Sequence, residues 1–203
     1  INLHAGKLPD YRGGSPMNWA IINGEDAGTA TIHYATERVD AGDVLLERPF
    51  TIEPDDTIAD VRAKTLDMFP EMLVEVVQQL EAGTAETRPI DITEGTYWGS
   101  RLPQDGRISW TEQSAKEVND FVRALTHPYP GAFTFLGDQK LYIWEVSLME
   151  EDVRHAPGRI CMRRGEGRVV AARDRGVLVE TVQPEGQKEQ AAGDYLERGE
   201  YLK

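Results

Sequence analysis

Apolar residues that recur every three or four positions over residues 58–80 predict one face of a long helix. Asp55 and Asp56 precede the pattern, and we expect one of them to cap the helix, which Gly83 ends. Pro70 lies inside the pattern, where its ring would clash with the preceding turn. We therefore expect a kink or a break into two helices near this proline.

Two shorter helices are predicted from the residues at their ends. Ser15 followed by Pro16 suits the first turn of a helix that Gly24 closes. Farther along, Ser114 and Glu117 have the spacing of a capping box, in which each side chain bonds the backbone of the other residue. The apolar positions after Ser114 form one side of this second helix, which stops before a proline-rich turn.

Alternating apolar and polar residues, rich in β-branched types, predict strands in both halves of the chain. In the first half they cover residues 29–34 and 44–51, with Asp40 in the turn region between them. In the second half they are short and closely spaced, which is typical of a small barrel. These later strands are predicted at residues 132–136, 140–148, 159–163, 168–172 and 177–182.

A stretch rich in glycine, proline and threonine separates the two patterns at residues 83–107. We therefore expect an α/β domain in residues 1–90, a linker in residues 91–110 and a small barrel domain in residues 111–203. Two unequal domains also suit the length of 203 residues, because each part is long enough to bury a core.

The composition is that of a soluble globular protein, with 40% hydrophobic and 28% charged residues. No apolar run approaches the roughly 20 residues that a membrane span needs, and no secretory signal is visible. Cys161 is the one cysteine, so no internal disulfide can form and a cytoplasmic location is the simplest expectation. With only Cys161 and the distant His155 as candidate ligands there, we expect no metal site.

The net charge of −13 is concentrated in the first half of the chain. Because phosphate affinity comes mainly from lysine and arginine, an acidic chain argues against broad nucleic-acid binding. Seven arginines between Arg154 and Arg175 are a local exception that could face a polyanion. The favoured interpretation is a set of strands whose arginine side chains are solvated.

Asn2 and His4 are the first candidates for chemistry. They lie two residues apart, so on an extended strand their side chains point to the same face. Taken alone, such a pair is more often a turn or a surface pair than a site, and Asp40 reads as a turn residue. His33, on the strand before Asp40, is interpreted as a packed or hydrogen-bonded structural histidine.

Several longer motifs surround these residues. They are His4-Ala5-Gly6-Lys7-Leu8-Pro9-Asp10-Tyr11-Arg12-Gly13, Asn18-Trp19-Ala20, Gly28-Thr29-x-Thr31-x-His33 and Val39-Asp40-Ala41-Gly42. In this order and spacing they resemble the core of the folate-dependent formyltransferase family. The resemblance implies that Asn2, His4 and Asp40 are catalytic. It also implies an α/β fold, the second part of a Rossmann-like formyltransferase domain.

Formyl transfer explains the types of these three residues. Attack of a neutral amine on the formyl group of 10-formyltetrahydrofolate gives a tetrahedral intermediate with negative charge on oxygen. Asn2 can donate its amide N–H to that oxygen, and His4 can bond the same oxygen or take the proton of the amine. Asp40 would orient His4 and could pass a proton through water to the departing folate nitrogen.

The resemblance also implies where the two substrates bind. The pterin of 10-formyltetrahydrofolate would lie against the backbone of Thr36, Glu37, Arg38 and Val39. Candidates for contacts with the amine substrate are Lys7, Tyr11 and Arg12, on a loop where many relatives read Ser-Leu-Leu-Pro and this chain reads Gly6-Lys7-Leu8-Pro9. The family builds the rest of the pocket on strands before the Asn-x-His strand, so we expect a fragment. The alternative is that another chain supplies the missing half.

Motifs in the second half indicate the acceptor. They are Gly99-x-Arg101-x-Pro103-x-Asp105-Gly106-x-Ile108-x-Trp110 and Arg123-Ala124-x-Thr126-His127-Pro128-Tyr129-Pro130-Gly131-Ala132-Phe133. They resemble the linker and the OB-like C-terminal barrel of the sugar N-formyltransferases, which implies the amine of a nucleotide-linked sugar as acceptor and allows a homodimer. Alternatives are methionyl-tRNA, which the acidic chain makes less favourable, and hydroxyornithine in siderophore synthesis. A non-catalytic binding or assembly module is the alternative from another class.

Overall fold

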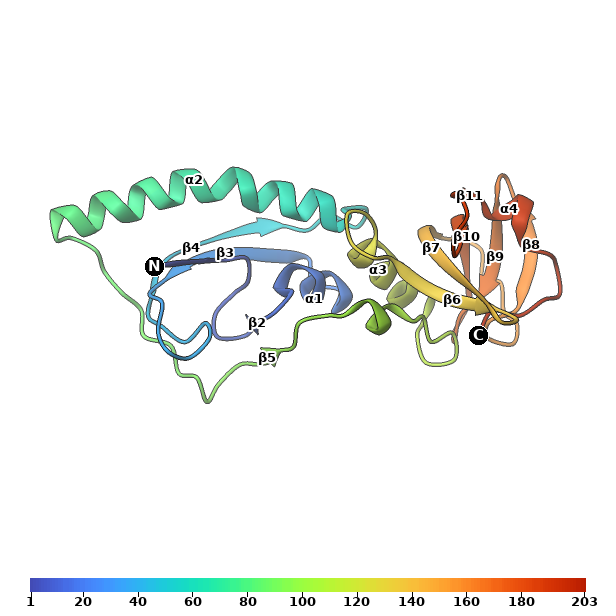
Figure 1. The fold of residues 1–203 in the computed structure, drawn as a ribbon, viewed down its shortest axis with the longest axis horizontal. Helices are drawn as coiled ribbons and strands as arrows, with labels where there is room; N and C mark the ends of the chain where they lie inside the picture. Colours follow the sequence, from blue (N-terminus) through green and yellow to red (C-terminus); the bar gives the residue numbers. More distant parts are fainter. The chain divides into compact units, whose positions relative to one another are not determined.

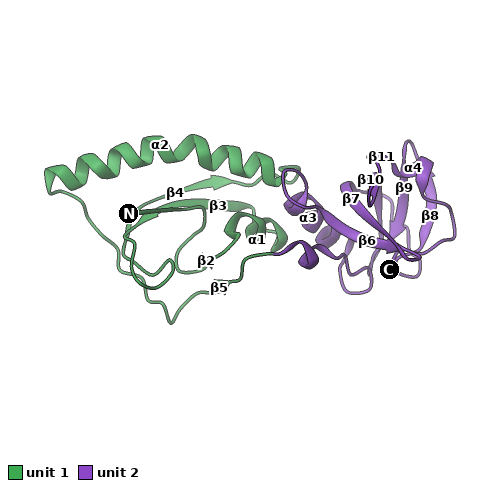
Figure 2. Cartoon of the chain, in the orientation of Figure 1, with its two compact units in different colours: residues 1–101 green, residues 102–203 purple.

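The computed structural model describes residues 1–203 and divides them into two compact units, which Figure 2 shows in different colours. Unit 1 comprises Ile1–Arg101 and unit 2 comprises Leu102–Lys203. The division lies inside the stretch that the sequence assigns to a linker. Each unit has its own sheet and its own buried residues.

The sheet of unit 1 has three antiparallel strands in the order β1-β3-β4 (Figure 1). They are β1 (Asn2–His4), β3 (Ala27–His33) and β4 (Val44–Thr51). β1 is an outer strand, and its pairing with β3 places Asn2 opposite His33 and His4 opposite Thr31. The two strands predicted in the first half are confirmed, the second with the same bounds.

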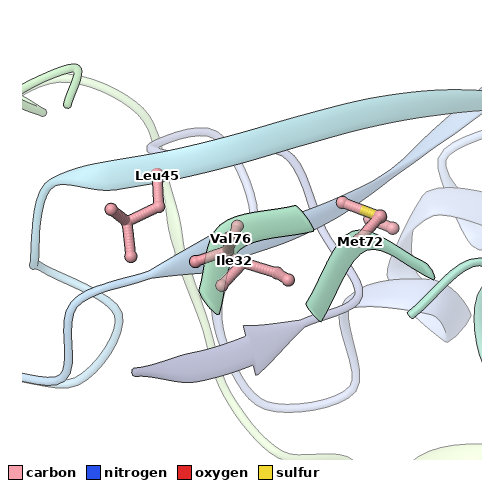
Figure 3. Packing of buried hydrophobic residues seen from close by; sticks show 5 residues of the cluster. Ile32, Leu45, Met72 and Val76 are labelled. Atoms are coloured by element: carbon pink, nitrogen blue, oxygen red, sulfur yellow. The ribbon is translucent and has the colours of Figure 1, made fainter. Parts of the chain in front are cut away.

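The long helix α2 (Ile58–Ala82) runs along this sheet (Figure 1). The buried residues between them are Ala30, Ile32, Leu45, Met72 and Val76. Figure 3 shows Ile32 of β3 beside Val76 of α2, with Met72 one turn away along the helix. Burial of apolar surface contributes roughly 25 cal/mol per Å², so this packing, more than helix propensity, holds α2 in place.

Helix α2 is not broken at Pro70, which lies inside its continuous span. Of the two predicted outcomes, a kink or a break into two helices, the break is therefore wrong. A proline in a helix interior removes one backbone donor and costs about 3 kcal/mol. Residues on both sides of the proline pack on the core and hold the helical path across it: Met68, Phe69, Met72 and Leu73.

The start of α2 also differs from the sequence prediction. Its N-cap is Thr57, whose backbone N–H and hydroxyl donate to Asp60 Oδ2 at 2.8 Å and 2.6 Å. Neither Asp55 nor Asp56 is the cap, because Asp56 instead accepts a backbone N–H from the preceding turn at 2.8 Å. Gly83 ends the helix as predicted, with a left-handed φ of 69° that glycine adopts without strain.

The short helix α1 (Pro16–Ile22) lies where the sequence predicts it. Gly24 closes it by donating its backbone N–H to the carbonyl oxygen of Ile21 at 2.9 Å. Ser15 occupies the N-cap position but makes no capping bond with its side chain. The reason is its left-handed backbone, with a φ of 56°, since a capping side chain needs an extended backbone.

Two short strands, β2 (Arg12–Gly13) and β5 (Tyr97–Trp98), form a separate parallel pair in unit 1. β2 belongs to the loop that follows β1, and β5 belongs to the irregular segment that follows α2. The first part of the segment predicted as a linker, up to Arg101, is thus part of the structure of unit 1.

Unit 2 begins with the 3-10 turn η1 (Pro103–Gly106) and helix α3 (Ala115–Leu125), whose predicted capping box between Ser114 and Glu117 is confirmed by bonds of 3.2 Å and 2.7 Å. Its sheet has the order β6-β7-β10-β9-β8. These strands are β6 (Ala132–Leu136), β7 (Gln139–Leu148), β8 (Ile160–Arg164), β9 (Gly167–Ala171) and β10 (Gly176–Pro184). β11 (Gln190–Ala191) pairs with β10 and leads into the short helix α4 (Ala192–Tyr195).

The five strands predicted in unit 2 are present, but their sheet does not close into the predicted barrel. β6 and β8 remain its two outer strands. The last residues of the chain bond to the segments at both edges. Phe135 and Lys203 exchange two backbone hydrogen bonds of 3.0 Å and 2.9 Å, and Leu202 donates to the carbonyl oxygen of Gly158 at 2.8 Å.

Five arginines of unit 2 have side-chain partners within the unit. Side-chain partners close to them are Arg154 with Asp152, Arg159 with Tyr201, Arg163 with Asp194, Arg164 with Glu151 and Arg173 with Glu117. This pairing favours the interpretation as charged strand faces over a surface for a polyanion.

No helix is long and apolar enough to cross a membrane. No group of three or more histidine, cysteine or acidic side chains could hold a metal ion.

Candidate active site

Asn2 and His4 of β1 meet Asp40, which lies in the loop between β3 and β4. The amide Nδ2 of Asn2 donates to Asp40 Oδ1 at 3.3 Å, and His4 Nδ1 lies 3.5 Å from Asp40 Oδ2. His4 and Asp40 are buried, with exposed fractions of 6% and 8%. The three residues that the sequence singles out therefore form one cluster in unit 1.

The loop that carries Asp40 is held by its backbone. Asp40 has a left-handed φ of 47°, a conformation that aspartate adopts more readily than most residues. Gly42 lies so close to Tyr34 that a Cβ would be 1.9 Å from the carbonyl oxygen of Tyr34. The backbone N–H of Tyr34 also donates to the carbonyl oxygen of Asp43 at 3.0 Å. Only glycine fits position 42, and the tight turn brings the Asp40 carboxylate to β1.

A backbone group of β2 also holds the Asp40 carboxylate. Gly13 of β2 donates its N–H to Asp40 Oδ2 at 2.9 Å. With the amide of Asn2, each oxygen of Asp40 therefore accepts one N–H, which offsets the cost of burying a charged group. Sequence reasoning did not identify Gly13, because a backbone donor leaves no signal in the residue type.

His33 is a further member of the cluster that sequence reasoning left outside the site. Its Nδ1 lies 2.8 Å from the carbonyl oxygen of Tyr34, which can only accept, so Nδ1 carries the hydrogen. The neutral ring can then accept the Asn2 amide at Nε2, at 3.0 Å, and Nε2 also lies 3.4 Å from Asp40 Oδ1. His33 is 1% exposed. The signal that could have found it is the register, which pairs His33 with Asn2.

Both ring nitrogens of His4 face oxygen atoms. Nε2 lies 2.7 Å from the carbonyl oxygen of Tyr11 and therefore donates to it, while Nδ1 faces Asp40. Burial lowers the pKa of His4 below its ordinary 6.5, and the Asp40 carboxylate opposes this shift. The ring can thus carry a second proton next to Asp40 or release it, which is the property of a proton-transfer group.

The residues expected to hold the pterin, Thr36, Glu37, Arg38 and Val39, lie in the exposed loop that ends at Asp40. Within it, the hydroxyl of Thr36 donates to the carbonyl oxygen of Arg38 at 2.9 Å. The backbone N–H groups of residues 36–39 make no backbone hydrogen bond. They are therefore available to a ring system that carries donors and acceptors at its edge.

The three expected acceptor contacts separate in the structure. Lys7 forms an ion pair of 2.8 Å with Asp10, and the Tyr11 hydroxyl donates to Glu25 at 2.6 Å. Burial raises the pKa of the Tyr11 phenol to about 12. Arg12 instead donates to the carbonyl oxygen of Ile92 at 3.2 Å, in the segment after α2.

Lys7 and Tyr11 line a cavity of about 320 Å³, together with Gly6, Asp10, Glu25 and Phe50. This volume lies in the range of small-molecule pockets. Gly6 connects the cavity to His4, because a Cβ at Gly6 would lie 2.9 Å from His4 Nε2. Arg12 does not line the cavity.

Comparisons with solved structures find the same fold elsewhere. HypX from Aquifex aeolicus in complex with tetrahydrofolic acid has a TM-score of 0.72 at 23% identity, over 96% of this chain and 34% of HypX. An N-formyltransferase from Helicobacter canadensis, solved with folinic acid and dTDP-3-aminofucose, has a TM-score of 0.66 at 19% identity, over 90% of this chain and 65% of that one. Methionyl-tRNA formyltransferase from Clostridium thermocellum has a TM-score of 0.56 at 23% identity, over 72% and 62%. This chain thus spans about a third of HypX.

The sequence itself matches the two domain families of one enzyme group. Residues 1–77 match the family described as formyl transferase, and residues 102–199 match formyl transferase, C-terminal domain. The first match contains Asn2, His4 and Asp40, and the second covers nearly all of unit 2. The chain belongs to the formyl transferase family.

Proposed function

We propose that this chain carries the reacting residues of a folate-dependent N-formyltransferase, which moves a formyl group from 10-formyltetrahydrofolate to a primary amine. The observation that carries the proposal is the buried cluster in which the Asn2 amide and the His4 imidazole share the Asp40 carboxylate. An N–H donor beside a proton-transfer group is the combination that acyl transfer to an amine requires.

In the first step, the amine nitrogen bonds to the formyl carbon and the carbonyl electrons move to oxygen. To stabilise this oxyanion, the Asn2 amide redirects to it one of the two N–H groups that bond Asp40 and His33 in the free site. Loss of one such donor typically costs about 100- to 1000-fold in kcat. In the second step, the bond from the formyl carbon to the folate nitrogen breaks. The proton that the amine loses ends on that nitrogen. His4 and Asp40 act as a coupled pair in moving it.

The loop at residues 36–39 is our proposed contact for the pterin of the folate. Its backbone N–H groups are not used within the protein, and it leads directly into Asp40. Two relatives were solved with folate compounds, HypX with tetrahydrofolic acid and the Helicobacter canadensis enzyme with folinic acid. Both observations support a folate beside the cluster.

For the acceptor we propose the amine of a nucleotide-linked sugar. The relative solved with dTDP-3-aminofucose supports this class of substrate. The cavity next to His4 is lined by Glu25 and by Asp10, and Asp10 is paired with Lys7. Glu25 is thus the acidic group that favours the approach of an amine, which arrives protonated. The internal pairing of the arginines of unit 2 makes the phosphate backbone of tRNA a poorer fit.

The test uses the product of the complete gene, because this chain spans 34% of HypX and 65% of the Helicobacter canadensis enzyme. Formyl transfer from 10-formyltetrahydrofolate is measured with 3-amino and 4-amino sugar nucleotides, hydroxyornithine and methionyl-tRNA as acceptors. We expect turnover with an amino sugar nucleotide. Activity on methionyl-tRNA alone would move the function to translation initiation. No transfer to any acceptor would favour a binding or assembly module.

Variants of the cluster test the assigned residues. Asn2→Ala, His4→Ala and Asp40→Asn should each lower kcat at least roughly 100-fold, because each removes a group that acts on the transition state. His155→Ala and Asp138→Asn are matched controls, since both residues are exposed in unit 2. Cluster variants that retain the wild-type kcat would exclude these three residues from catalysis.

A further inference from the structure

The last part of unit 1, residues 95–101, is bound to the loop that follows His4. We call this segment the strap. Its strand β5 pairs in parallel with β2, and the backbone N–H of Gly14 donates to the carbonyl oxygen of Trp98 at 2.9 Å. The N–H of Arg12 donates to Thr96 at 3.2 Å. The strap therefore follows the loop along its backbone.

Trp98 is the side chain that fixes the strap. Its indole stacks on Tyr11 with ring centres 5.8 Å apart and planes at 11°, and packs on Trp19 at 4.7 Å. Its Nε1–H donates to the carbonyl oxygen of Asp10 at 3.1 Å. Trp19 in turn donates to the carbonyl oxygen of Gly99 at 3.0 Å. Stacked aromatic pairs contribute beyond their buried area, so this is the best anchored contact of the strap.

Glycines allow the strap and the loop to approach this closely. A Cβ at Gly13 would lie 2.2 Å from the carbonyl oxygen of Trp98, and one at Gly14 would lie 2.1 Å from Ser100 Oγ. Gly95 meets the carbonyl oxygen of Pro9 in the same way, at 2.4 Å. Gly13 also has a left-handed φ of 95°. A shift of the strap would therefore displace the backbone of the loop.

The loop held by the strap is the one that bonds to the reacting residues. The carbonyl oxygen of Tyr11 accepts from His4 Nε2 at 2.7 Å, and the N–H of Gly13 donates to Asp40 at 2.9 Å. These two backbone groups lie on either side of Arg12, within the span that Trp98 contacts from Asp10 to Gly14. The position of the His4 ring and that of the Asp40 carboxylate thus depend on one short segment.

We propose that Trp98 is a positioning residue for the formyl transfer reaction: by fixing residues 10–14, it sets the backbone groups that orient His4 and Asp40. The role in catalysis rests on the function proposed for the cluster, whereas the effect on the His4 ring does not. The hydrogen bond and the ring contacts of the Trp98 side chain are with Asp10, Tyr11 and Trp19, and not with His4 or Asp40. Its effect is transmitted by the loop backbone.

The variants Trp98→Leu and Trp98→Phe test the proposal in the full chain. Leucine retains apolar volume but removes the stacked ring and the Nε1–H. Phenylalanine also lacks the Nε1–H but keeps an aromatic ring that can stack on Tyr11. Tyr97→Leu is the matched control, because Tyr97 precedes Trp98 in β5 and its side chain is 58% exposed. The measurement without substrate is the imidazole N–H signal of His4 in nitrogen-15 NMR spectra, since the hydrogen bond to Tyr11 protects Nε2–H from exchange.

We expect the protected His4 signal to vanish in Trp98→Leu and to persist in Trp98→Phe and Tyr97→Leu. In the product of the complete gene, Trp98→Leu should lower kcat about 10- to 100-fold, as small misplacements of catalytic groups do. The KM for the folate should change less, and Trp98→Phe should restore most of the activity.

Two results would overturn the proposal. One is a Trp98→Leu protein that is folded and keeps the His4 signal, and the other is a wild-type kcat in that variant. If Trp98→Leu does not fold, Ser100→Val tests whether the strap positions the loop, because a bulkier residue would press on Gly14 and weaken the His4 signal. The two proposals can fail separately. If the wild type transfers no formyl group but the variant loses the His4 signal, the proposed function is contradicted, whereas the positioning of His4 by Trp98 is supported.

Discussion

At the scale of single residues, the charge on His4 decides what the cluster can do. Its ring is buried among Asp40, His33 and the backbone of Tyr11, with Glu25 bonded to the Tyr11 hydroxyl farther out. Burial lowers the pKa of His4, and Asp40 partly offsets this effect. At neutral pH the ring is thus held ready to accept a proton.

We expect the NMR titration midpoint of His4 in the wild type to lie below its ordinary 6.5. Because the folded state then binds fewer protons than the unfolded state, the contribution of His4 to stability is complete above its ordinary pKa of 6.5. That contribution is lost as pH falls toward the folded pKa. Asp40→Asn should move the midpoint lower still, since it removes the charge that raises the pKa. A midpoint above 6.5 in the wild type would contradict the burial argument.

His33 supports a second prediction at this scale, because it contacts both Asn2 and Asp40 from β3. We expect His33→Ala to lower kcat about tenfold or more, since it removes one of the two buried acceptors of the Asn2 amide. A gain of activity in His33→Gln over His33→Ala would separate orientation of Asn2 from loss of volume. An unchanged kcat in His33→Ala would make His33 a residue of the core alone.

At the scale of elements, local signals in the sequence predicted most of the fold. The strands at β3, β4 and β6 and the capping box of α3 follow from alternation and spacing, which depend on neighbouring residues. Local signals gave wrong predictions where tertiary packing or the backbone conformation determines the local structure. Pro70 predicts a break that the core of unit 1 prevents, and Ser15 predicts a cap that its left-handed backbone excludes.

Only the members of the candidate site that act through their side chains were predictable from the sequence. Asn2 and His4 stand two residues apart, and the motif around Asp40 gives the third member of the cluster. The backbone groups of Tyr11 and Gly13 could not be read in the same way, because every residue has a carbonyl and nearly every residue has an N–H. They enter the site through the tertiary contact of β2 with β5.

At the scale of the whole molecule, the chain consists of two units with separate cores. Unit 1 buries the residues between its sheet and α2, and the contacts among Asn2, His4 and Asp40 lie entirely within residues 1–101. Unit 2 has its own buried residues, among them Trp110, Val122, Ile143 and Val179. The N–H of the first residue of unit 2 is also bonded within the unit, since Leu102 donates it to the carboxylate of Asp105 at 2.7 Å.

We therefore expect residues 102–203 to fold when produced alone. A domain of roughly 100 residues should unfold cooperatively with an enthalpy of about 60–80 kcal/mol at its midpoint, which calorimetry measures. Trp110→Phe removes the buried hydrogen bond from the indole to Thr134, so it should lower this midpoint by several degrees in the isolated unit and in the full chain alike. In the full chain, Trp98→Phe is the control, because Trp98 belongs to unit 1 and its substitution should leave the transition of unit 2 unchanged. A broad, non-cooperative transition of the isolated unit would mean that its core depends on unit 1.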